Sequence, residues 1–186
     1  MGSSTAPAAR RAVRSRDGQE AWDIKRGAPM SDTPTSPPSQ AQLDRFAEGF
    51  NQSLTLRHFG ARMSFPEGRK VVVTLPEVKP EHRGGLGTSA VNGGILAALF
   101  DLAIGCTPAL RDPTRRCATV QLSMSFERPA TGDSLQVEAV IDHGGPTTVF
   151  ASARLLDSEG RVCARCQGVV RVSSKPWAAG DSPATN

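Results

Sequence analysis

Several features that mark common kinds of protein are missing from this chain of 186 residues. Its longest apolar stretch is about half of the roughly 20 residues that a membrane-spanning helix needs. Residues 1–29 hold three of the four net positive charges, so the remainder is close to neutral and has no basic stripe. Because nucleic-acid-binding domains present such a stripe, we expect neither a nucleic acid nor a membrane among the partners.

The motifs of several enzyme classes are missing too. We find no Ser-His-Asp order, no phosphate-cradling glycine loop before a helix and no cluster of metal ligands. Cys163 and Cys166 have the spacing of a redox or zinc pair, but no second pair follows them. They also fall in a predicted strand, where an offset of three places side chains on opposite faces. We therefore expect Cys163 and Cys166 to be structural, free thiols in a reducing, cytoplasmic location, and no metal or other cofactor.

The two ends of the chain differ in composition from the middle. Residues 1–40 are rich in Ala, Arg, Ser, Thr, Pro and Gly without apolar periodicity, which predicts a disordered extension. Its early part is Arg-rich and poor in acids, as in an organelle transit peptide. We favour the alternative that Met30 is the functional start and that residues 1–29 are an upstream extension. One domain is expected over residues 41–174, followed by a flexible tail over residues 175–186.

The apolar pattern of the middle part predicts an α+β domain. Helical spacing predicts an amphipathic helix over residues 40–54 and an apolar helix over residues 93–110. Alternation predicts six strands, over residues 59–65, 70–75, 117–128, 135–141, 149–155 and 162–172. The strand over residues 117–128 is expected to place Val120, Leu122, Met124 and Phe126 on one face. In the last strand, Cys163 falls on the polar face.

The apolar helix needs cover on two flanks. Tight turns join most of the later strands, so these strands are expected to be antiparallel neighbours. Their sheet can cover one flank of the helix, and a second copy of the chain is the simplest cover for the other. Asp101 is the only charge between Ile95 and Ile104. A carboxylate in apolar surroundings is costly to ionise, so it is paired, hydrogen-bonded or used in chemistry, unless it lies at a wet helix end.

Two segments carry a resemblance to a known family. They are NGGILAALFDLAIG, from Asn92 to Gly105, and TVQLSMSFERP, from Thr119 to Pro129. Both resemble the hotdog-fold acyl-CoA thioesterases of the phenylacetyl-CoA and 4-hydroxybenzoyl-CoA type, over about residues 43–173. The resemblance implies an antiparallel sheet wrapped around a long central helix. It also implies a homodimer, often paired as a dimer of dimers into a homotetramer, with active sites at the dimer interface.

In this family His-Gly-Gly is followed by an acid eight residues after the first glycine, an interval that Gly93 and Asp101 keep. Eight helical residues advance about 12 Å, so one chain cannot bring both groups to one carbonyl. The resemblance implies that the Gly93 amide stabilises the thioester oxygen and that Asp101 of the other chain acts as general base or nucleophile. Thr119 matches a position where Ser or Thr holds the water or the carboxylate, the alternative being an ordinary strand threonine.

The sequence departs from the family pattern in three ways. Asn92 stands in place of the usual histidine; it can cap a helix or donate a hydrogen bond but cannot carry a proton at neutral pH. Leu86 stands in place of an Asn or Gln that positions the thioester, and the loop over residues 84–91 is longer than in the family. Asn92, Ser89 and Thr88 are candidates to take over this positioning.

Further candidates for substrate binding come from the same resemblance. Gly94 adjoins the main amide donor, and His82 lies in the loop before the helix. Arg128 and Thr148 fall in regions that border the coenzyme A phosphates in relatives. For His82 and Arg128 the alternative is an exposed, solvated side chain.

The resemblance predicts an enzyme that hydrolyses a small or medium acyl-CoA, aryl or aliphatic. The alternative from a different class is an acyl-CoA or acyl-carrier binding protein with weak or no turnover, since Asn92 and Leu86 replace two functional residues. A hydratase or dehydratase is less favoured, because those enzymes pair their acid with a histidine that is missing here.

Overall fold

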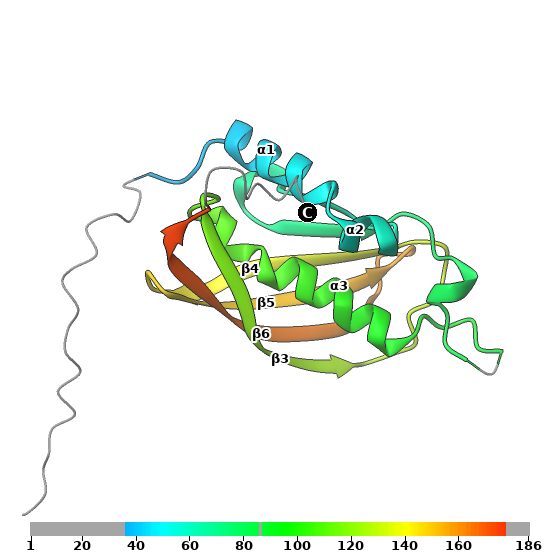
Figure 1. The fold of residues 1–186 in the computed structure, drawn as a ribbon. Coiled ribbons are helices and arrows are strands. Elements are labelled where there is room, and N and C mark those ends of the chain that lie inside the picture. Colours follow the sequence, from blue (N-terminus) through cyan, green and yellow to red (C-terminus); the bar gives the residue numbers. More distant parts are fainter. Residues whose placement is uncertain (1–35, 86, 178–186) are drawn as a thin grey trace, which may run out of the picture. The chain divides into compact units, whose positions relative to one another are not determined.

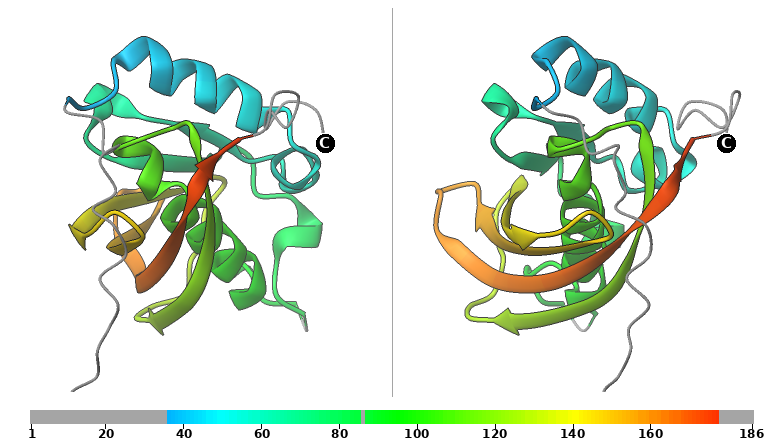
Figure 2. Two further views of the ribbon diagram at one scale, coloured as in Figure 1. Left: turned by 60° about the vertical axis from the view of Figure 1, so that its left-hand side comes forward. Right: turned by 90° about the vertical axis from the view of Figure 1, so that its left-hand side faces the viewer.

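The computed structural model describes residues 36–85 and 87–177. They form a single antiparallel sheet that curls around one long helix, α3 (Gly93–Gly105) (Figures 1 and 2). This arrangement confirms the predicted α+β class and the sheet wrapped around a central helix. Most of the predicted N-terminal extension lies outside the described residues.

The remaining elements precede and follow α3. The helices are α1 (Gln40–Asn51) and α2 (Leu54–Phe59), with short 3-10 turns η1 (Pro66–Gly68), η2 (Pro80–His82) and η3 (Thr107–Leu110). The strands are β1 (Arg62–Ser64), β2 (Val71–Leu75), β3 (Arg115–Phe126), β4 (Leu135–Gly144), β5 (Thr148–Asp157) and β6 (Val162–Pro176). Their order in the sheet is β1-β2-β4-β5-β6-β3, so that β3 pairs on one side only, with β6.

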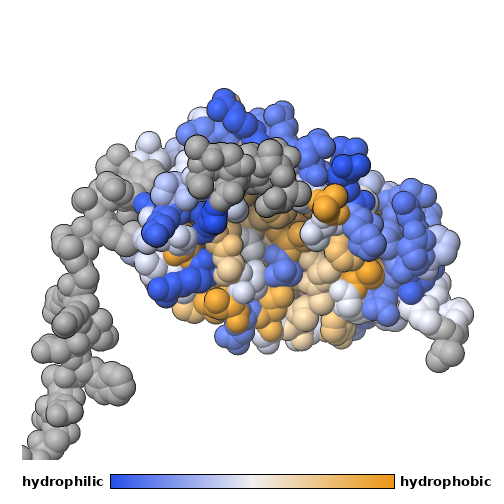
Figure 3. Space-filling model, viewed as in Figure 1, coloured by the Kyte–Doolittle hydropathy of each residue, from blue (hydrophilic) through white to orange (hydrophobic). Residues whose placement is uncertain are grey.

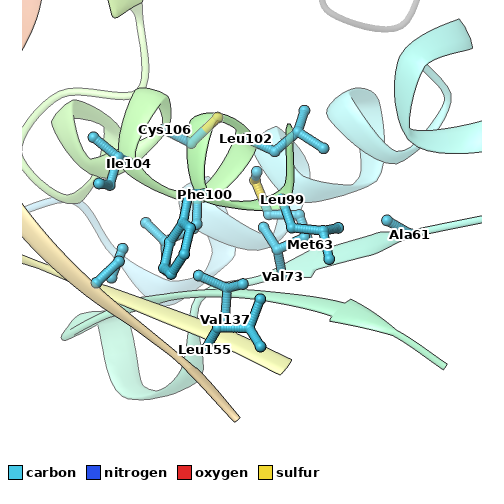
Figure 4. Packing of buried hydrophobic residues seen from close by; sticks show 14 of the residues in the cluster. Ala61, Met63, Val73, Leu99, Phe100, Leu102, Ile104, Cys106, Val137 and Leu155 are labelled. Carbon is cyan, nitrogen blue, oxygen red and sulfur yellow. The ribbon is translucent and has the colours of Figure 1, made fainter. Parts of the chain in front are cut away.

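The core lies between α3 and the inner face of the sheet. α3 packs against β2 to β6. Figure 4 shows Phe100 on the side of α3 that faces Val137 and Leu155, and Leu102 on the opposite side. Phe100, Val137 and Leu155 are fully buried. Burial of one such side chain contributes roughly 1.5–3 kcal/mol, so this layer fixes the position of α3 on the sheet.

The first two predicted elements need correction at their ends. The helix predicted to reach residue 54 ends at Asn51, whose carboxamide bonds both the N–H (2.7 Å) and the C=O (3.0 Å) of Met63 in β1. Part of the strand predicted from residue 59 is the short helix α2 instead. Ser53 caps α2, and Gly60 ends it in the left-handed conformation at φ 68°. Such a one-and-a-half-turn helix has no periodicity long enough to recognise in the sequence.

The central helix is shorter than predicted. α3 ends at Gly105, and the chain to Leu110 continues as the 3-10 turn η3. Pro108 has no backbone N–H to continue the α-helical pattern. The Thr107 hydroxyl donates instead to the Ile104 carbonyl at 2.7 Å.

The predicted face of β3 is wrong at Val120. A β-bulge lies between Thr119 and Gln121, and it shifts the alternation by one residue. Thr119 therefore faces inward with Leu122 and Met124, whereas Val120 is 63% exposed. An irregularity in β6 has a similar effect on Cys163, which was expected on the polar face but is fully buried.

The C-terminal strand extends further than predicted. β6 continues to Pro176, whereas the domain was expected to end at residue 174 and to be followed by a flexible tail. Arg115, at the start of β3, pairs with Pro176, so the long edge strand continues to find backbone partners there.

One segment has the length and composition of a membrane span. Residues Gly93–Leu110 pass that test, although Asp101 interrupts the stretch. In the structure 61% of the segment is buried inside the domain. It therefore serves as the core helix of this fold.

Candidate active site on the exposed flank of α3

One flank of α3 is not covered by the sheet. It carries small residues, the exposed Gly93 and Gly94 and the half-buried Ala97 and Ala98, together with the exposed Asp101. Figure 3 shows apolar surface over the region of α3 and β3, with hydrophilic residues around it. The flank is thus apolar, made of small side chains, and interrupted by one carboxylate.

Asp101 is exposed in the single chain. Within residues 36–85 and 87–177 its side chain has no hydrogen bond or ion pair. It is near the buried thiols of Cys106 and Cys166, because its charge contributes to raising the pKa of both, after the larger effect of burial. Asp101 is therefore an exposed side chain on an apolar surface, without a hydrogen-bond partner in the described part of the chain.

The N-terminus of α3 offers one free amide. Asn92 is the N-cap residue, and its Oδ1 accepts a hydrogen bond from the Gly94 N–H at 2.8 Å. The N–H groups of Ile95 and Leu96 donate to the Asn92 carbonyl at 3.0 and 3.1 Å. The Gly93 N–H has no acceptor within the described part of the chain. It is thus the amide that can bind a substrate oxygen, whereas Gly94 is already engaged by Asn92.

The ring of Phe126 forms a wall beside this amide. A Cβ placed on Gly93 would lie 3.6 Å from Cζ of Phe126, at the end of β3. The Phe126 side chain is 54% exposed. Sequence reasoning placed Phe126 only on an apolar strand face and missed its contact with Gly93. Arg128, two residues further on, is exposed at the same end of the sheet.

Thr119 lies at the other end of the flank. A Cβ on Gly105 would come within 3.0 Å of the Thr119 Oγ1, so this glycine makes room for the threonine. Gly105 follows Asp101 by one helical turn, about 6 Å along the axis. No hydrogen bond joins Thr119 and Asp101 within the described residues. The structure therefore brings Thr119 to the helix of Asp101 without a hydrogen bond between the two residues.

The neighbouring thiols are not candidates for a nucleophile. Cys117 donates to the Gly105 carbonyl at 3.0 Å, and burial raises its pKa to about 11. Burial likewise raises the pKa of Cys106 well above its ordinary value. Both groups are protonated at neutral pH, and the thiolate is the reactive form of cysteine. Among the described residues no group of three His, Cys, Asp or Glu side chains could hold a metal ion.

The loop before α3 supports the helix N-terminus. His82 is only 4% exposed, and its Nδ1 accepts from the Lys79 N–H at 3.1 Å. Its carbonyl accepts from the Asn92 N–H at 2.9 Å. The alternative of a solvated histidine is thus wrong, and His82 holds the loop rather than lining an open site. Ser89 is exposed, with its carbonyl bonded by Arg83, whereas Leu86 lies outside the described residues.

Thr148 is not brought to the other candidates within one chain. It pairs with Arg171 of β6, whereas Phe126 pairs with Ala164 of the same strand. These positions are seven residues apart along β6, or about 23 Å. Within one chain, Thr148 therefore lies at the end of the sheet opposite to Gly93.

Comparison with known proteins agrees with this architecture. Residues 89–164 match the sequence model of the thioesterase superfamily. The described domain has the hotdog fold, and its segment 89–164 is similar to the thioesterase superfamily. None of the curated proteins matches the sequence significantly. This similarity supports a function of the acyl-CoA thioesterase kind.

Solved structures of this superfamily have the same fold. A protein from Shewanella oneidensis, described as related to the thioesterase superfamily, is 22% identical with a TM-score of 0.66, over 74% of this chain and all of that one. The Escherichia coli PaaI protein, from the phenylacetic acid degradation operon, is 20% identical with a TM-score of 0.61, and the match covers 73% of this chain and 98% of that protein. A thioesterase from Haemophilus influenzae is 15% identical with a TM-score of 0.61, and the match covers 70% of this chain and 90% of that protein. At these identities the likeness establishes the fold.

A hollow of the described domain lies elsewhere. It measures about 660 Å³ and opens on the outer face of the sheet, between residues such as Ser123, Glu138 and Arg165. Its charged groups are already paired: Glu138 with Lys70 at 2.6 Å and with Arg154, and Arg165 with Glu127.

Proposed function

We propose that this protein hydrolyses the thioester of a small or medium acyl-CoA, with an aryl or aliphatic acyl group. The observation that carries the proposal is the placement of Gly93 and Asp101 on the uncovered flank of α3. One supplies a free N–H at a helix N-terminus, and the other supplies an unpaired carboxylate. These are the two chemical functions that addition of water to a thioester requires.

The two groups must come from different chains. Gly93 and Asp101 are eight residues apart on one straight helix, a distance of about 12 Å along its axis. A donor must lie within about 3 Å of the carbonyl oxygen that it stabilises. In our proposal, two copies therefore pack their α3 flanks together, and Asp101 of the second copy reaches the thioester held by Gly93.

The edge of the sheet also favours a homodimer. β3 has an unpaired side along its length, and the small residues on the α3 flank allow a second helix to approach closely. An unprotected edge strand of this length would otherwise invite uncontrolled association. We include pairing along β3 in the proposal, with a dimer of dimers as the larger assembly.

The reaction then follows from simple proton transfers. As general base, Asp101 takes a proton from water, and the oxygen attacks the thioester carbon. The carbonyl oxygen becomes negative and is stabilised by the Gly93 amide and the helix dipole. Collapse breaks the C–S bond, and the coenzyme A sulfur leaves and takes up a proton. As nucleophile, Asp101 would instead form an anhydride that water then cleaves.

Purified protein offered a panel of acyl-CoA substrates, with a thiol reagent to detect free coenzyme A, tests the proposal. Asp101→Asn keeps the size of the side chain but removes its basicity, so we expect a loss of at least about 10²-fold in kcat. Equal release of coenzyme A by wild type and Asp101→Asn would overturn the assignment.

A binding function without turnover is the second candidate. It is favoured by Asn92, which places no titratable group next to the Gly93 amide. Tight binding of a non-hydrolysable acyl-CoA, without release of coenzyme A from any substrate of the panel, would establish it. For either function we propose a cytoplasmic location, because all four cysteines are free thiols and none forms a disulfide.

A further inference from the structure

We infer that Asn92 is a catalytic residue, which donates a second hydrogen bond to the thioester oxygen through its Nδ2. The inference rests on the proposed function and concerns the same site. Its basis is that every polar group of Asn92 except Nδ2 already has a partner within the chain.

The backbone of Asn92 is held on both sides. Its N–H donates to the His82 carbonyl at 2.9 Å, and its carbonyl accepts from Ile95 and Leu96. The preceding residue, Val91, pairs with Arg83 and donates to the Ala130 carbonyl at 2.9 Å. Three segments of the chain thus fix the position from which the carboxamide projects.

The orientation of the carboxamide is fixed as well. Its Oδ1 accepts the Gly94 N–H, and the reverse orientation would place two donors against each other. A Cβ on Gly94 would lie only 3.0 Å from this Oδ1, so residue 94 must be small for the contact to form. With Oδ1 engaged, the NH₂ group points away from Gly94.

Nδ2 is therefore the one unused polar atom of Asn92. The side chain is exposed, and Nδ2 has no acceptor among the described residues. It lies at the same helix end as the free Gly93 N–H. Two fixed donors directed at one oxygen are the usual means of stabilising an oxyanion, and removing one costs about 10²–10³ in kcat. The Asn92 carboxamide keeps its N–H donors at every pH near neutrality, because it does not titrate.

The test separates capping from catalysis. Ser and Asp cap a helix about as well as Asn, so Asn92→Ser and Asn92→Asp should keep the thermal midpoint of wild type or raise it. Neither keeps an N–H donor at the position of Nδ2, and Asp adds a negative charge beside the forming oxyanion. We expect kcat to fall by about 10²-fold in Asn92→Ser and further in Asn92→Asp, with little change in KM.

A matched control is Ser39→Ala, which removes the capping box of α1 away from this site. It should lower the thermal midpoint and leave kcat unchanged. If kcat of Asn92→Ser or Asn92→Asp stays within threefold of wild type while wild type turns over, the inference is wrong and the proposed function stands. If wild type and Asp101→Asn both fail to release coenzyme A, the inference and the proposed function are both wrong.

Discussion

Val120 is the residue at which the proposed dimer can be tested most directly. It lies on the bulge of the edge strand β3, with 63% of its surface exposed in the single chain. Pairing of two chains along β3 would cover it in both copies. Because Val120 makes little contact within its own chain, Val120→Lys should leave the fold intact and act on the assembly alone.

The expected effect follows from the exposed area. Full burial of a valine is worth about 1.5–3 kcal/mol, so covering the exposed 63% of Val120 contributes about 1–2 kcal/mol per chain. The Val120→Lys dimer loses this contribution in both copies, about 2–4 kcal/mol of its free energy of association in total. At about 1.4 kcal/mol for each tenfold change, the Kd of the dimer should rise about 30- to 700-fold.

Sedimentation velocity over a range of protein concentrations measures this shift. Since the proposed site needs Gly93 and Asp101 from different chains, the specific activity of Val120→Lys should fall on dilution together with the dimer fraction. Leu54→Lys is the matched control, because Leu54 is 69% exposed but lies on α2. A Val120→Lys protein as dimeric as the Leu54→Lys control would refute pairing along β3. Full activity of the monomer would refute a shared site.

Three further predictions concern other parts of the domain. A Cβ on Gly168 would lie 2.7 Å from Ile104 of α3, so Gly168→Ala should lower the free energy of unfolding by about 1–3 kcal/mol in urea titrations. Gly145 has open space around it, so the control Gly145→Ala should change the free energy of unfolding by less than about 0.5 kcal/mol. Burial raises the pKa of Asp157, but hydrogen bonds in its turn lower it by more. Its stabilisation is therefore complete above the unfolded pKa of about 3.9 and is lost as the pH falls through the folded pKa, so Asp157→Asn should be less stable than wild type at pH 7, by a difference that shrinks as the pH falls below about 3.9. Phe126→Ala should impair acyl-CoA turnover while the thermal midpoint stays near that of wild type, because the ring is 54% exposed and borders the free Gly93 amide. An unchanged kcat/KM would show that Phe126 is not part of the site.

The sequence predicted those features that depend on regular periodicity. Six alternating segments became the six strands, and the apolar run after Gly93 became the helix at the centre. The interval between Gly93 and Asp101, with the known rise of a helix, was enough to argue that one chain cannot complete the site. Each of these inferences uses only the geometry of a single regular element.

The errors fall where regularity is interrupted. A bulge at Val120 exchanges the inner and outer faces of β3, and no residue type in that segment signals it. The burial of His82 and the fixed carboxamide of Asn92 depend on hydrogen bonds that join the loop to the helix end and to Ala130. Phe126 meets Gly93 only because β3 ends beside the start of α3. Such contacts come from tertiary packing, which single-sequence patterns do not contain.

The uncovered flank of α3 combines two requirements that oppose each other. Close packing against a second copy calls for small apolar residues, which Gly94, Ala97 and Ala98 supply, but a carboxylate in that interface would lose its water without gaining a partner. Asp101 avoids this loss if the contact between two copies leaves a wet opening beside it. A thioester and its attacking water need the same opening. The proposed interface is therefore closed by the small residues around Asp101 and open to water at the carboxylate itself.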